Sequence, residues 1–116
     1  MSDLKMPQPD SPESELPLPP ATFEFFVLSM KMQAEMHLGL VHFGDEKERP
    51  EPDFRVARHT IDLLAMFQEK TRGNLTIDEQ RLIENSLTEL RFRFVQVMEA
   101  TNKQHEPKDE PRIIIP

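Results

Sequence analysis

The sequence predicts an all-α protein, a small three-helix unit with disordered termini. The 11 prolines leave two long proline-free windows, residues 21–49 and 53–106. Within these windows apolar residues recur at helical spacing, and capping residues stand at the expected boundaries. We therefore assign the three-helix domain to residues 22–100. A proline-rich acidic tail (1–21) should precede it and a polar tail (101–116) should follow it, both without enough apolar surface to fold.

The first predicted helix covers residues 22–43, the most apolar stretch of the chain. Thr22 can cap its first turn, and Gly44 offers a left-handed end. Four polar or charged residues lie within about 20° of one line along its surface: Glu24, Lys31, Glu35 and His42. Nearly all the remaining circumference is apolar, so this helix is suited to contacts on almost every side.

The second and third helices should form an antiparallel hairpin, with the first helix packed across it. The charged segment 45–52 contains two prolines that prevent the first helix from continuing. The second helix should begin after Asp53, a good N-cap, and end at Gly73. Thr76 and Glu79 form a capping box that starts the third helix, which should end near residue 100. Such a short connector makes the two helices antiparallel neighbours.

The apolar arcs of the first two helices exceed what three helices can cover within one chain. The arc is nearly complete on the first helix and about 200° wide on the second. We therefore expect an isologous homodimer with the first helix at its centre. On the third helix Phe92 stands among polar residues and indicates a second contact surface. The candidate interface residues are Phe23, Phe26, Met30, Met36 and Phe92.

A polar line interrupts the apolar arc of the first helix at intervals of four residues: Ser29, Gln33 and His37. One interpretation is a register-fixing layer of hydrogen bonds, as single polar core residues provide in coiled coils. The other is the polar anchor of a small-ligand pocket. We favour the structural layer.

Other kinds of site find little support in the sequence. Methionine and histidine can bind soft metals, but Met30 and Met32 point about 160° apart on a helix, so we expect no metal and no cofactor. Three glycines cannot build a glycine-rich phosphate loop. His59 and Asp62 could pair as base and orienter, but nothing nearby supplies a nucleophile. We expect no enzymatic activity.

Composition excludes two further classes of partner. The net charge is −7 and no segment is strongly basic, so we expect no nucleic-acid binding. The longest apolar run would place Lys31 and Glu35 near the middle of a bilayer, so we expect no membrane span. The absence of cysteine and of a secretory signal favours the cytoplasm.

Two blocks of the sequence, LSMKMQAEMHLG (28–39) and ARHTIDLLAMFQEKTRGNLTIDEQRLIENSLTELRFRFVQV (57–97), resemble a bacterial family known as domain of unknown function 1844. The shared elements are the leucine-glycine ending of the first helix, the TIDLL core, the EKTRGNLT turn and the LxELRFRFV stretch. The resemblance covers roughly residues 22–98. It implies a bacterial cytosolic helical protein, and it implies no activity and no functional residues.

Taken together, these patterns favour a small cytoplasmic helical protein that homodimerises and acts as a non-enzymatic interaction or scaffold protein, with a protein partner. The alternative is a small-ligand or metal-binding helical domain that uses Ser29, Gln33 and His37.

Overall fold

The computed structural model describes residues 16–104 and contains three α-helices within them. Helix α1 spans Phe23–His37, α2 spans Phe54–Lys70 and α3 spans Ile77–Gln104, with a short 3-10 turn, η3, at Glu46–Glu48. No strand occurs in this part of the chain. The predicted all-α class is confirmed.

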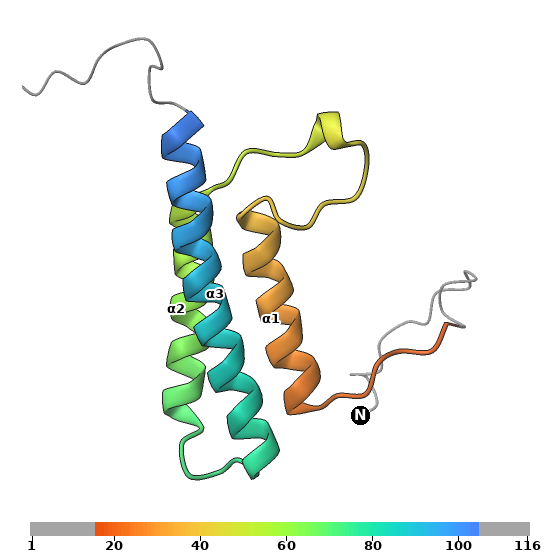
Figure 1. Cartoon of the computed structure of the whole chain (residues 1–116). Coiled ribbons are helices and arrows are strands. Elements are labelled where there is room, and N and C mark those ends of the chain that lie inside the picture. The colour runs from red at the N-terminus through yellow and green to blue at the C-terminus, as the bar shows by residue number, and fades with distance from the viewer. Residues whose placement is uncertain (1–15, 105–116) are drawn as a thin grey trace, which may run out of the picture.

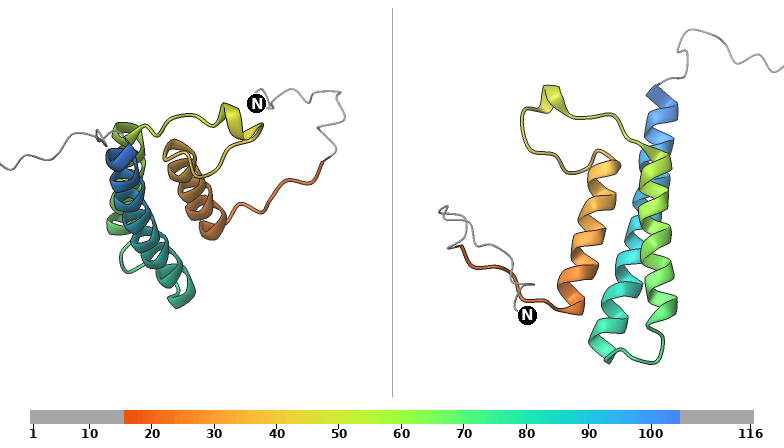
Figure 2. Two further views of the ribbon diagram at one scale, coloured as in Figure 1. Left: turned by 45° about the horizontal axis from the view of Figure 1, so that its top comes forward. Right: turned by 180° about the vertical axis from the view of Figure 1, so that it is seen from behind.

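The three helices lie side by side in an up-down-up arrangement (Figures 1 and 2). Helices α2 and α3 form the predicted antiparallel hairpin, and α1 packs alongside it, antiparallel to α2. Each helix contacts both of the others. The three-helix unit is therefore as predicted.

Capping residues start α1 and α2 where the sequence places them. The hydroxyl of Thr22 accepts a hydrogen bond of 3.0 Å from the Phe25 amide. The carboxylate of Asp53 accepts one of 3.1 Å from the Val56 amide. Each cap satisfies a backbone donor that has no partner within its helix.

The turn between α2 and α3 follows the predicted pattern. The Glu79 amide donates to the hydroxyl of Thr76 at 3.1 Å, and the Thr76 amide donates to the carboxylate of Glu79 at 2.9 Å. Helix α2 ends at Lys70, shortly before Gly73, whose φ is +86°. Only glycine adopts such a conformation without strain.

Helix α1 ends at His37, well before the predicted end at Gly44. The Gly39 amide donates to the carbonyl of Met36 at 3.0 Å, and the Leu40 amide donates to that of Glu35 at 2.9 Å. With Gly39 at a φ of +78°, this is a Schellman motif. The prediction was wrong because apolar residues continue after Gly39, so that the apolar pattern alone does not mark the helix end.

Helix α3 is longer than predicted and continues past residue 100 to Gln104. Residues 101–104 are therefore helical rather than part of a tail. Of the predicted N-terminal tail 1–21, residues 16–21 are described and are exposed without helix or strand, whereas residues 1–15 and the rest of the C-terminal tail, 105–116, lie outside the described residues.

All three helices contribute to one apolar core. Its centre is a cluster of side chains from facing stripes of the helices: Val27, Ala34, Ile61, Leu64, Ile83, Leu87 and Leu90. Val27 and Ala34 are fully buried and are the α1 residues in this cluster. Because Ala34 is small, it allows the α1 backbone to approach the hairpin closely.

The connector between α1 and α2 comprises residues 38–53 and arches away from the helices (Figure 1). It is longer than the predicted hinge at 45–52, because α1 ends earlier. Its two ends meet, since the Asp53 amide donates to the carbonyl of His37 at 2.8 Å.

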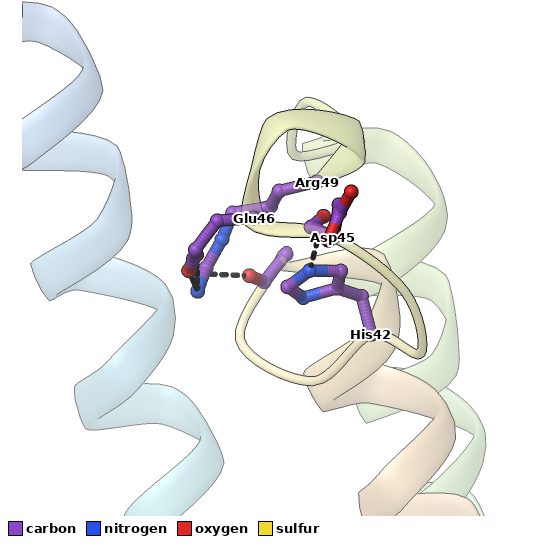
Figure 3. A network of polar contacts seen from close by, with 5 residues as sticks. His42, Asp45, Glu46 and Arg49 are labelled. Carbon is purple, nitrogen blue, oxygen red and sulfur yellow. Dashed lines mark hydrogen bonds and ion pairs between the residues drawn. The ribbon is translucent and has the colours of Figure 1, made fainter.

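Polar contacts within the connector fix its shape (Figure 3). The guanidinium of Arg49 donates to the carbonyl of Gly39 at 2.7 Å and pairs with the Glu46 carboxylate at 2.6 Å. The ring Nε2 of His42 lies 3.1 Å from the carbonyl oxygen of Asp45. Arg49 thus ties the far side of the connector back to the end of α1.

Candidate functional site

Four large apolar side chains lie on the outward face of α1. Phe25, Leu28, Met32 and Met36 are 45%, 47%, 48% and 39% exposed. At about 100° per residue they fall within roughly 80° of the helix circumference, opposite the face that packs on the core. We call these four residues the α1 stripe.

Further apolar side chains are exposed where α1 meets α2. The Phe26 ring is 44% exposed and lies 4.7 Å from the Phe67 ring, centroid to centroid. Leu63 is one turn before Phe67 on the same side of α2, and it is 38% exposed. Apolar side chains of both helices are therefore exposed at their junction, and the exposed Gln33 separates them from the α1 stripe.

The four predicted interface residues of α1 fall into two groups. Met36 belongs to the α1 stripe, and Phe26 is exposed on the side of α1 that faces α2. Phe23 and Met30 are half-buried and pack against the core, with the Phe23 ring stacked 5.4 Å from that of Phe67. Much of the surface of these two side chains is thus used within the chain.

Sequence reasoning did not single out Phe25, Leu28 and Met32 as interface candidates. A helix that is apolar nearly all round has no periodic pattern to show which side faces inward. Val27 and Ala34 are buried on the side of α1 opposite the α1 stripe, and their burial shows which side of the helix faces the core.

Phe92 lies on the solvent side of α3, as its sequence position indicates, and is 62% exposed. Val95, one turn further along, is 52% exposed. Phe92 comes from the third helix, and it is separate from the α1 stripe.

The polar line of α1 borders the α1 stripe on its α2 side. The hydroxyl of Ser29 donates to the carbonyl of Phe25 in its own helix at 2.8 Å. Gln33 is exposed and His37 is half-buried. The structure brings these three side chains into no shared hydrogen-bond layer among the described residues, and they line none of the grooves described below. Within residues 16–104 no group of three or more His, Cys, Asp or Glu side chains is arranged to hold a metal ion.

An ion pair fixes α1 against α3. The ammonium of Lys31 lies 2.9 Å from the Glu89 carboxylate, which also lies 3.3 Å from the Arg93 guanidinium. The hydrogen bond and charge of Lys31, together with the charge of Arg93, lower the pKa of Glu89, although burial opposes them. The charged line of α1 therefore includes a residue that faces α3, and the sequence did not predict this contact.

Two open grooves lie away from the α1 stripe. One runs between α2 and α3 as a hollow of about 670 Å³ and a smaller one of about 240 Å³, and both include Arg58 and Phe94 in their lining. The other, of about 540 Å³, lies between the connector and the last turns of α3 and includes Arg49 and Val97.

In the described range, no helix is both long enough and apolar enough to cross a bilayer. Comparison with curated proteins and with solved structures gives no match for the chain. A family model described as "Domain of unknown function (DUF1844)" matches residues 20–96, which include all of α1 and α2 and most of α3. The chain therefore belongs to the DUF1844 family.

Proposed function

We propose that this protein is a non-enzymatic interaction protein that forms an isologous homodimer through the α1 stripe. One observation carries the proposal: four large apolar side chains, each 39–48% exposed, share one face of a helix whose opposite face is already packed. Leaving a contiguous apolar surface in water costs free energy, and contact with a second copy removes that cost.

A two-fold axis through the α1 stripe sets α1 of one protomer against α1 of the other. Ser29, Gln33 and His37 then lie at the border of the contact. Polar groups at the border of an apolar interface remain hydrated or bond across it, and they help to fix its register. This arrangement gives the polar line a structural role.

A dimer presents two copies of every surface that the contact leaves free. Two linked copies of a weak binding surface hold a bivalent partner more tightly than one copy does. This suits a scaffold that gathers a protein partner, with Phe92 on a face that the α1 stripe does not use. We place this role in the cytoplasm, in keeping with a chain that contains no cysteine.

The test is the mass of the full chain by light scattering over a series of concentrations. We expect the mass of a dimer for the unmodified chain. Met32→Glu places a charge within the α1 stripe and should give a monomer with unchanged helical circular dichroism. Ile77→Glu makes the same kind of change at a site that is 68% exposed and outside the stripe, and it should leave the dimer intact. A monomer at every concentration, or a dimer that survives Met32→Glu, would overturn the proposal.

A further inference from the structure

The groove between α2 and α3 consists of two adjoining hollows of about 670 and 240 Å³. Both are lined by Arg58, Asp62 and Phe94, and no residue of α1 lines either of them. We call the two hollows together the α2–α3 groove. A dimer formed through the α1 stripe leaves this groove open.

The floor of the α2–α3 groove is apolar and aromatic. The rings of Phe54 and Phe94 meet edge to face with centroids 5.5 Å apart. Both side chains are half-buried, and Ile61 is buried at the base of the smaller hollow. Val95 adds an apolar surface that is 52% exposed. Such a floor accommodates a large apolar side chain.

The rim of the groove carries three exposed arginines: Arg55, Arg58 and Arg91. None of them forms an ion pair with another described residue, including Asp62, which is the one acidic residue of the lining. Three arginines elsewhere in the described range do pair with glutamates: Arg49, Arg72 and Arg93. The groove is therefore a local concentration of positive charge on a chain whose net charge is −7.

We propose that the α2–α3 groove binds an acidic peptide segment of a partner protein. An apolar side chain of that segment packs on Phe54 and Phe94, and its carboxylates pair with the arginines of the rim. The planar guanidinium group binds a carboxylate with two parallel hydrogen bonds. Arginine is therefore better suited than lysine to bind the carboxylates of a peptide. Arginine and phenylalanine are also both enriched at protein–protein interfaces.

The negative charge of the rest of the chain favours a short acidic peptide over larger polyanions as the ligand of the groove. A short peptide contacts only the groove, where positive charge prevails. A nucleic acid or an anionic bilayer extends beyond the groove and meets a surface whose net charge is negative, and long-range repulsion then opposes binding.

Selection of random displayed peptides on the immobilised full chain tests this proposal. We expect the selected peptides to be enriched in aspartate and glutamate beside a large apolar residue. Affinity for a selected peptide is measured by fluorescence anisotropy. It should fall about tenfold in Arg58→Gln and by a similar factor in Arg91→Gln. It should also fall as salt is added.

Arg81→Gln is the matched control. Arg81 is exposed on the same helix as Arg91 and forms no ion pair with the described residues, but it lies outside the groove. This variant should bind the peptide normally. Met32→Glu should also bind, because the inference does not depend on the dimer.

Three results would overturn the proposal. The first is a selection that yields no peptide, or peptides without acidic residues. The second is unchanged affinity in the Arg58→Gln/Arg91→Gln double variant. The third is binding of the unmodified chain to phosphatidylglycerol vesicles or to single-stranded DNA that is tighter than its binding to any selected peptide and is lost in this double variant, which would assign the groove to another class of partner.

Discussion

Lys31 on α1 and Glu89 on α3 form the ion pair that joins the first helix to the last, with 2.9 Å between ammonium and carboxylate. Arg93 lies one turn after Glu89 and shares the same carboxylate at 3.3 Å. At about 100° per residue, Lys31 lies within roughly 60° of Val27 and Ala34, on the side of α1 that faces the hairpin, and roughly 60–140° from the residues of the α1 stripe. The ion pair thus favours the rotation of α1 that exposes the α1 stripe.

Replacing Glu89 with glutamine should destabilise the protein at neutral pH and much less in acid. The folded pKa of Glu89 is lowered, chiefly by Lys31, so that folding favours its ionised form. The stabilisation is therefore complete above the unfolded pKa of about 4.3 and is lost as the pH falls through the folded pKa. Because both side chains are partly exposed, we expect a loss of about 0.2–1 kcal/mol at neutral pH.

Denaturant melts of Glu89→Gln and the unmodified chain, over a series of pH values, provide the measurement. The difference between them should narrow below a pH of about 4. Glu99→Gln is the control, since Glu99 is exposed and forms no ion pair with the described residues. A difference for Glu89→Gln that does not vary with pH would contradict an ionic origin.

Gly39→Ala should cost more stability than Gly73→Ala. Both glycines have a positive φ, +78° and +86°, so that each alanine pays about 1–2 kcal/mol for the left-handed conformation. At Gly39 the added methyl group would also lie 3.2 Å from the Pro50 carbonyl oxygen, whereas at Gly73 it would meet no atom within 4 Å. The difference between the losses of melting temperature in the two variants measures the cost of this contact. Equal losses would show that the connector shifts to accommodate the methyl group without a measurable loss of stability.

Thr76→Ala should destabilise the protein by about 1 kcal/mol, because the α3 capping box loses its hydroxyl acceptor. Thr88→Ala is the control on the same helix, at an exposed position whose side chain forms no hydrogen bond with the described residues. Urea melts should show little change for Thr88→Ala. A similar loss for Thr88→Ala would show that the cost is not specific to the cap, because alanine has the higher helix propensity at that position.

Local patterns predicted the helix starts well. Thr22, Asp53 and Thr76 each act within a few residues of their own position, so the sequence alone identifies them as caps. Contacts between distant residues were harder to predict. Gly39 and Gly44 are both candidates for the end of α1, and Gly39 is held at the helix end by Arg49 and Pro50 from the connector.

The same reasoning applies to the candidate site. An apolar surface on α1 could be predicted, because almost any rotation of this helix leaves large side chains outside. The particular residues could not, since Phe23 and Met30 face inward while Leu28 and Met32 face outward. The α2–α3 groove combines arginines from two helices, and no single stretch of sequence contains that arrangement.

The two ends of the connector between α1 and α2 lie next to each other, because the Asp53 amide donates a hydrogen bond of 2.8 Å to the His37 carbonyl. A segment closed in this way does not determine the spacing of the helices on either side of it. Its length can therefore change with only a slow rise in closure entropy. Residues near η3 are accordingly the place where a reporter sequence or an additional binding element can be inserted while the helical bundle keeps its register.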